Sequence, residues 1–321
     1  MNLLNLVLRI VGRGNLTNKS LKMANKEVAF KKCHKCCVIE AGSNHKPNCL
    51  RKLKYNKLEN FICHLAHKLA LEEIDIMNKL KGENVMSLLF ISIDDRNHIV
   101  IGMEFMSNGS VEDYIKNPDN DVLTRDALKW VYQIGTGLIY LFDKGLIHRD
   151  VSARNALLDG DLNARLSDMG LTKSTGQEYN NDIYYAVTTQ TPLPTYLMAP
   201  ELLDSMIRKE TLTFTHKSDV WAFGLLIWEI LTRGEKAFSR YPFLSFKQPC
   251  IQATLFEIRN GCVPDFYRLG DRLELLCDDV VKRALTVDNE KRPDMRSLIK
   301  TISEYAFNTC EDVSSSLVFK L

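Results

Sequence analysis

Several features are scarce in this chain, and each scarcity excludes a class of protein. The 321 residues carry a formal net charge of only +2, which gives no electrostatic case for binding nucleic acid or an acidic membrane. No apolar run reaches the roughly 18 residues that a membrane-spanning helix needs. The N-terminus, Met1–Arg9, lacks both a basic segment and a cleavage site, so it is predicted to be a first strand rather than a signal peptide.

Disulfides are not expected either. There are nine cysteines, but the chain is long and shows no secretory signal, which argues against a disulfide framework. The composition, 45% hydrophobic and 26% charged, is that of an ordinary globular protein with one two-lobed domain or two small ones. We therefore expect a soluble protein of a reducing compartment, the cytoplasm.

Two polar residues, Asp150 and Asn155, are predicted to lie on a loop between ordered elements. They belong to the stretch His148–Asn155, which reads H-R-D-V-S-A-R-N. An apolar helical pattern at Leu128–Phe142 precedes it, and a strand-like run at Ala156–Leu158 follows it. On such a loop a rigid scaffold can aim polar groups at a ligand.

A second acid, Asp168, follows in the sequence L-S-D-M-G, after a turn at Asp159–Asn163 that joins two short strands. An Asp, an Asn and another Asp on neighbouring loops suit the placement of a hydroxyl nucleophile beside metal-bound phosphates. The spacing H-R-D-x-x-x-x-N followed by D-x-G resembles the catalytic loop and the metal-binding loop of the protein kinases. By that resemblance, Asp150 orients the acceptor hydroxyl and accepts its proton, while Asn155 and Asp168 hold Mg²⁺.

Further kinase-like motifs lie upstream. Gly12 and Gly14 form a candidate phosphate loop, because glycines let backbone amides approach phosphate oxygens. The alternative is a plain turn. Thr17 stands where the kinase pattern has its third glycine. The strand V-A-F-K ends at Lys31 and resembles the V-A-I-K strand, whose Lys contacts the α- and β-phosphates. In the helical pattern E-x-x-x-M-x-x-L, Glu73 is the implied partner of Lys31.

The stretch between Lys31 and this helix is longer than the family's, so residues 33–60 are interpreted as an insertion. It is rich in potential metal ligands: Cys33, His34, Cys36, Cys37, His45 and Cys49, with Cys63, His64 and His67 just beyond. A Cys-x-x-Cys pair followed by His-x-x-x-Cys could supply four tetrahedral zinc ligands. The alternative, which we favour, is an irregular surface loop, because the spacings fit zinc patterns only loosely.

A buried strand is predicted at His98–Met106, followed by a polar connector and a helix start at Ser110. In kinases this segment links the lobes and binds adenine through backbone groups. By that resemblance Met103 lies at the back of the nucleotide pocket, and Glu104 and Met106 belong to the hinge. A core strand with a turn is the alternative.

The polar segment 171–193 is the expected activation segment, and it ends at Met198–Glu201, which reads M-A-P-E. Its pair Tyr184 and Tyr185 resembles the segment of insulin- and neurotrophin-receptor-like tyrosine kinases. Phosphorylation there would add about −1.5 to −2 charge per site and could pair with Arg149. The alternative is an unmodified surface loop in which the tyrosines pack.

Three positions indicate tyrosine specificity. Arg154 precedes Asn155 as in tyrosine kinases, Ser152 stands where serine/threonine kinases place Lys, and Pro194 suits a platform for the longer tyrosine side chain. Leu197 replaces the family's usual Trp.

The remaining motifs are structural. An apolar helix at Lys217–Leu231 is expected to be buried, with Asp219 bracing the catalytic loop. Arg292 is expected to pair with Glu201 in a buried ion pair. The intervals around Met206–Lys209 and Glu235–Gln252 are longer than the family's usual loops.

The order of these motifs identifies the chain as a member of the protein kinases, tyrosine-kinase group. The resemblance implies an α+β bilobal fold: a kinase domain at 1–308, with a β-rich N-lobe at about 1–105, a mostly helical C-lobe at about 109–308, and a tail at 309–321. It implies ATP and Mg²⁺ as cofactors, protein tyrosine hydroxyls as acceptors, and no nucleic-acid partner. The implied catalytic and nucleotide-binding residues are Asp150, Lys31, Arg154, Asn155, Gly12, Gly14, Glu73, Glu104, Met106 and Asp168. A pseudokinase scaffold and a serine/threonine kinase are the alternatives.

Overall fold

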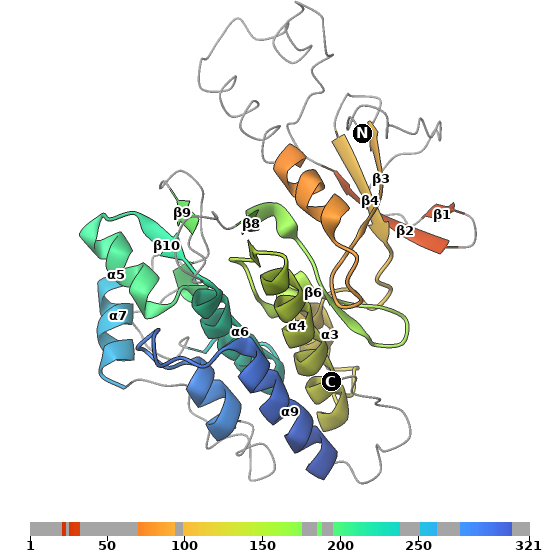
Figure 1. Ribbon diagram of the computed structural model, residues 1–321. Helices are drawn as coiled ribbons and strands as arrows, with labels where there is room; N and C mark the ends of the chain where they lie inside the picture. The colour runs from red at the N-terminus through yellow and green to blue at the C-terminus, as the bar shows by residue number, and fades with distance from the viewer. Residues whose placement is uncertain are drawn as a thin grey trace, which may run out of the picture. The chain divides into compact units, whose positions relative to one another are not determined.

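The computed structural model describes eight stretches of the chain, shown as ribbons in Figure 1: residues 21–23, 26–32, 70–93, 99–174, 185–187, 195–237, 251–261 and 277–309. The chain divides into two compact units. One comprises Met1–Ser107 with Asp168–Gly170, and the other comprises Asn108–Ser167 with Leu171–Leu321. Among the stretches described, no helix combines the length and the apolar character needed to cross a bilayer.

The N-terminal unit is built on an antiparallel sheet of four strands in the order β1-β2-β4-β3. These strands are β1 (Leu21–Met23), β2 (Lys26–Lys32), β3 (Leu88–Ile93) and β4 (Ile99–Glu104). The buried strand expected around His98–Met106 is therefore confirmed as β4. At Gly102 an added Cβ would lie 2.4 Å from the Phe90 ring, so the sheet needs glycine there.

A helix over residues 70–79 carries Glu73 in the same unit. Ile74, Met77 and Leu80 are each no more than 2% exposed, which confirms the apolar face that the sequence predicts. Glu73, next to Ile74, is buried on the same helix.

The C-terminal unit is mostly helical. Its helices are α3 (Val111–Lys116), α4 (Thr124–Asp143), α5 (Pro200–Arg208), α6 (His216–Leu231), α7 (Ile251–Arg259) and α9 (Met295–Thr309), with a π-helical turn η7 (Cys277–Lys282). Helix α4 packs against α6 and α9, and α5 packs against α7 (Figure 1). The expected helix at Leu128–Phe142 lies within α4, which ends before Gly145, whose φ of 66° suits glycine.

Helix α6 is buried over nearly its whole length, as expected from its apolar sequence. It begins with a capping box, in which the Thr215 side chain accepts from the backbone of the first turn and Ser218 accepts from the Thr215 N–H. Two acids, Asp219 and Glu229, are buried among its apolar residues, each no more than 2% exposed. Because buried carboxylates need hydrogen-bond partners, both positions call for donors on neighbouring segments.

Short strands and turns hold the segments around the predicted loop. Strand β5 (Leu146–Ile147) pairs with β8 (Lys173–Ser174), β6 (Ala156–Leu158) with β7 (Ala164–Leu166), and β9 (Tyr185–Val187) with β10 (Leu212–Phe214). The predicted strand at Ala156–Leu158 and the turn that follows it are confirmed.

In the interval around Met206–Lys209, which the sequence makes longer than the family's usual loop, residues 206–208 form the last turn of α5 rather than a loop. Most of the second long interval, Glu235–Gln252, lies outside the described residues. Lys209 closes that helix in the left-handed region, at φ 59°. Several predicted features lie outside the described residues: Gly12, Gly14, Thr17, the first strand, the Cys/His-rich stretch, Tyr184 and Pro194.

Candidate active site

Lys31 makes two ion pairs within the N-terminal unit. Its Nζ donates to Oε1 of Glu73 at 2.6 Å and to Oδ1 of Asp168 at 2.7 Å. Strand β2 carries the lysine, the helix over 70–79 carries the buried Glu73, and Asp168 follows β7 with 47% of its side chain exposed. The structure thus brings together three side chains that the sequence placed far apart.

Electrostatics keep Lys31 protonated. Burial lowers its pKa, but the charges of Glu73 and Asp168 more than offset burial, so the pKa of Lys31 is raised overall. Burial also raises the pKa of Glu73, against the effect of Lys31. A fixed cation beside a partly exposed carboxylate can bind phosphate oxygens.

The backbone around Asp168 is unusual. Asp168 has a φ of 59°, in the left-handed region that non-glycine residues seldom adopt. At Gly170 an added Cβ would lie 3.1 Å from Oδ1 of Asp168, so a small residue leaves room for this carboxylate. Such strained positions cluster at functional sites. Met169, the next residue, is 1% exposed.

In the C-terminal unit, Asp219 holds the backbone of the predicted catalytic loop. Its two carboxylate oxygens accept from the backbone N–H groups of His148, at 2.7 Å, and Arg149, at 2.9 Å. Burial raises the pKa of Asp219, and the neighbouring His148 and the two N–H groups oppose that rise. The expected bracing role of Asp219 is therefore observed.

His148 ties this loop to the segment before Asp168. Its Nδ1 accepts from the Asp150 N–H at 3.2 Å, so the ring proton must be on Nε2, which donates to the Ser167 carbonyl at 3.0 Å. Ser167 in turn donates to the Asn155 carbonyl through both its N–H, at 2.7 Å, and its hydroxyl, at 2.8 Å. Sequence reasoning missed both roles, because they depend on backbone groups that no motif marks.

Asn155 closes the loop on itself. Its Nδ2 donates to the Asp150 carbonyl at 2.8 Å, which identifies the other amide atom as the oxygen Oδ1. An amide oxygen, and not an amide nitrogen, is the kind of atom that Mg²⁺ binds. Carboxylate and amide oxygens are hard donors, so the chemistry of Asp168 and Asn155 fits the predicted metal. Over the ranges that the structure covers, no group of three or more His, Cys, Asp or Glu could hold a metal ion.

Arg154 lies directly against the predicted catalytic base. One of its nitrogens, Nη2, donates to both carboxylate oxygens of Asp150, at 2.7 and 3.0 Å. Its Nη1 donates to the hydroxyl of Tyr196, in the 3₁₀ turn η4 (Thr195–Leu197). The sequence singled out Arg154 but gave no sign of Tyr196.

Arg292 and Glu201 form the expected ion pair. The two guanidinium nitrogens lie 2.8 and 3.0 Å from the carboxylate oxygens, and Arg292 is fully buried. Arg292 also donates to the backbone carbonyls of Lys217 and Thr286. These bonds fix α5 to the start of α6 and are structural rather than chemical.

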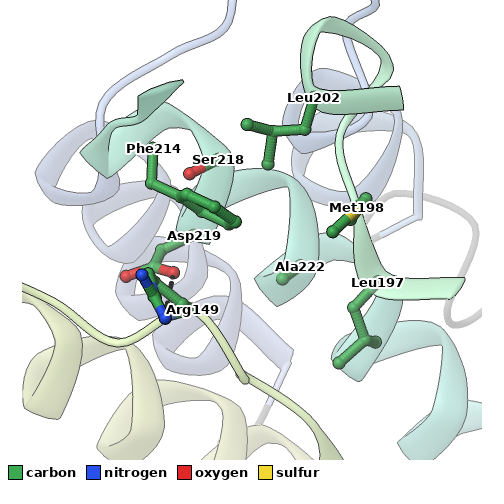
Figure 2. Close-up of a pocket in the computed structure, with 8 residues that line it drawn as sticks. All are labelled: Arg149, Leu197, Met198, Leu202, Phe214, Ser218, Asp219 and Ala222. Carbon is green, nitrogen blue, oxygen red and sulfur yellow. Dashed lines mark hydrogen bonds between the residues drawn. The ribbon is translucent and has the colours of Figure 1, made fainter. Parts of the chain in front are cut away.

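A small cavity lies beside the predicted catalytic loop, with Asp219 and Arg149 at one end and mostly apolar side chains around it (Figure 2). Its volume of about 10 Å³ holds no more than one water molecule. The Arg149 guanidinium lies 4.9 Å from the centre of the Phe214 ring. Leu197, which stands where the family has Trp, is buried in this wall, so the smaller residue leaves little empty space.

The remaining nucleotide-site predictions fall on the end of β4. Glu104 is the last residue of that strand and pairs with Val28 of β2, and Met106 is 6% exposed. Their contact with adenine stays a prediction.

Comparison with known proteins agrees with these motifs. The model of the protein tyrosine and serine/threonine kinase family matches residues 27–302. The chain is 32% identical to the tyrosine-protein kinase csk-1 of Caenorhabditis elegans over 200 residues, which are 62% of this chain and 35% of that protein. It is 31% identical to the tyrosine-protein kinase receptor svh-2 of the same organism over 169 residues, 52% of this chain and 15% of that protein.

The matched regions thus span about a third or less of each relative's length. The sheet in the N-terminal region and the helices in the C-terminal region are those of a kinase domain. The family match covers most of the chain and contains Lys31, Glu73, Asp150, Asn155 and Asp168. This chain therefore belongs to the protein tyrosine and serine/threonine kinase family.

Proposed function

We propose that the chain is an ATP-dependent protein kinase that transfers the γ-phosphoryl group to tyrosine hydroxyls of proteins. The observation that carries the proposal is the position of Lys31, bonded at once to Glu73 and Asp168. A lysine fixed in this way can contact phosphate oxygens, and Asp168 and Asn155 would hold Mg²⁺. When bound, ATP would supply the phosphoryl group, and Mg²⁺ would neutralise the charge of its phosphates.

In this proposal Asp150 is the base. The acceptor oxygen forms a bond to phosphorus as the bond to the leaving ADP oxygen breaks, and the acceptor proton passes to Asp150. The N–H groups held by Asp219 and the Asn155 amide keep the Asp150 backbone in place. Most of the rate enhancement in such a site comes from positioning and electrostatics.

Tyrosine specificity is supported by two observations. Arg154 is bonded to Asp150, and both relatives named above are tyrosine-protein kinases. Ser152, which stands where serine/threonine kinases have Lys, is fully buried. We further propose autophosphorylation at Tyr184 or Tyr185.

The assigned extent of the domain is also a proposal: a kinase domain at 1–308 followed by a tail at 309–321. Adenine would be bound through the backbone of Glu104 and Met106, and the phosphates also through Gly12 and Gly14. Because the reaction consumes ATP and a disulfide framework is not expected from the sequence, we propose that the reaction takes place in the cytoplasm.

The test is phosphoamino-acid analysis of the purified chain after incubation with ATP, Mg²⁺ and a tyrosine-containing polypeptide. Phosphotyrosine is expected; phosphoserine or phosphothreonine alone would instead identify a serine/threonine kinase. Asp150→Asn should abolish transfer while nucleotide binding remains, whereas Asp143→Asn, the same change at the exposed end of α4, should have no effect. A wild-type chain without transfer would support the pseudokinase alternative.

A further inference from the structure

Tyr196 connects two segments of the C-terminal unit that are far apart in sequence. Its hydroxyl accepts a hydrogen bond from Nη1 of Arg154, 42 positions earlier. The other terminal nitrogen of Arg154 is the one that donates to both oxygens of Asp150. One guanidinium therefore joins the Tyr196 phenol to the Asp150 carboxylate.

A second cation supports the same ring. Nζ of Lys236 lies 5.4 Å from the centre of the Tyr196 ring, and Cζ of Arg154 lies 5.6 Å from it. Both distances fall in the range of cation–π attraction. Lys236 is only 19% exposed, and its Nζ lies 2.6 Å from Oε1 of Glu229 and 3.3 Å from Oε1 of Glu112.

Glu229 connects Lys236 to the predicted catalytic loop. Its other oxygen, Oε2, accepts from the backbone N–H of Ala153 at 3.1 Å, next to Arg154 in the chain. Glu229 belongs to the buried part of helix α6. The Tyr196 ring is thus tied to the catalytic turn through Arg154 and, on a second route, through Lys236 and Glu229.

The phenol is held in its neutral form. Burial raises the pKa of Tyr196 far above its ordinary value, Arg154 opposes the rise, and the carboxylates of Glu229, Asp150 and Glu112 add to it. A neutral hydroxyl accepts from Arg154 without competing with Asp150 for its charge. The arrangement therefore orients Arg154 and leaves its ion pair with Asp150 intact.

We propose that Tyr196 is a positioning residue for phosphoryl transfer: its hydroxyl holds Arg154 in the orientation in which Nη2 faces Asp150, with Lys236 as support. The inference rests on the proposed function, in which Asp150 accepts the acceptor proton. Arg154 is 40% exposed, so its long side chain gains rotamer freedom once that hydroxyl is removed. Asp150 then loses a fixed partner at the moment of transfer.

The test is a double-mutant cycle on transfer to a tyrosine-containing polypeptide. Tyr196→Phe removes the hydroxyl and keeps the ring; kcat should fall about 10-fold or more, while KM for ATP changes less than about twofold. In an Arg154→Ala background, Tyr196→Phe should cause no further loss, because the residue it acts through is gone. The matched control is Tyr140→Phe in α4, whose ring also lies under a cation, Lys144, at 5.8 Å.

Three outcomes would overturn the proposal. They are an unchanged kcat for Tyr196→Phe, losses that multiply with those of Arg154→Ala, and a kcat loss that only follows the folded fraction in thermal unfolding. Each of these leaves the kinase activity of the wild type standing. Absence of transfer by the wild type overturns the proposed function itself, and this inference with it.

Discussion

Nζ of Lys31 lies 2.7 Å from Oδ1 of Asp168, although 137 positions separate the two residues in the chain. The lysine comes from β2, and the acid comes from the loop after β7. No local pattern could impose this contact, so it results from the fold. It makes Lys31 the first residue to test.

Lys31→Met should lower kcat for phosphoryl transfer by about 10²-fold or more, because it removes a fixed donor to developing charge. The same substitution at Lys79 is the control. Lys79 makes an exposed ion pair with Asp75 at 2.6 Å within one helix. Lys79→Met therefore removes the same charge as Lys31→Met, but away from the proposed site. Steady-state kinetics with ATP as the varied substrate would show the difference, and equal activity of the two variants would contradict the assigned role of Lys31.

Glu201→Leu should destabilise the fold by about 3–5 kcal/mol, since it leaves the fully buried Arg292 without its carboxylate. The comparison is Asp143→Leu, which breaks the pair between Asp143 and Arg296, 56% and 65% exposed. An exposed pair is worth at most about 1 kcal/mol. Urea unfolding of both variants measures the two losses, and similar values would contradict the buried pair's importance.

Asp219→Asn should cost about 1–3 kcal/mol and reduce transfer. An amide has only one acceptor oxygen, so one of the N–H groups of His148 and Arg149 would face an NH₂ group instead. Asp279→Asn, an exposed change in η7, serves as the control. Thermal unfolding together with kcat would detect both effects; a stable variant with full activity would show that the bracing is dispensable.

Low pH should remove the contribution of the Asp159 carboxylate to the free energy of unfolding. Burial alone would raise its pKa, but hydrogen bonds from Asn163 and from the Asp161 N–H outweigh burial, so the pKa is lowered from 3.8. Because the pKa of Asp159 is lower in the folded than in the unfolded chain, its stabilising contribution is fully present above pH 3.8. That contribution is lost as the pH falls through the pKa of the folded state. The deficit in unfolding free energy of Asp159→Asn should therefore shrink below about pH 4.

Asp161→Asn in the same turn is the control for that loss of charge. Urea unfolding of both variants between pH 7 and pH 3 gives the comparison. A deficit for Asp159→Asn that stays constant with pH would show that the charge of Asp159 has no part in the turn.

Much of the site was predictable because its motifs are local. The H-R-D-x-x-x-x-N spacing located Asp150 and Asn155, and the helical pattern around Glu73 selected the acid that bonds to Lys31. The burial of α6 followed from its continuous apolar sequence. In each case, neighbouring residues carried the whole signal.

Other features depend on the assembled fold. Tyr196 hydrogen-bonds to Arg154, which lies 42 positions earlier in the chain. Lys236 lies after the end of α6 and bonds to Glu229 within that helix. No sequence periodicity therefore indicates a role for Tyr196 or Lys236. The end of α5 was missed for a different reason. Lys209 adopts the left-handed conformation in which glycine usually stops a helix, so the usual stop signal was absent.

Helix α6 accepts hydrogen bonds from three backbone N–H groups of the predicted catalytic loop, those of His148 and Arg149 on Asp219 and that of Ala153 on Glu229. Because their acceptors lie on a buried helix, we expect these amides to reach solvent only when that helix unfolds. In native-state deuterium labelling they should therefore be among the slowest-exchanging amides, with protection close to the free energy of global unfolding. The loop that is proposed to perform the chemistry would then unfold only together with the core.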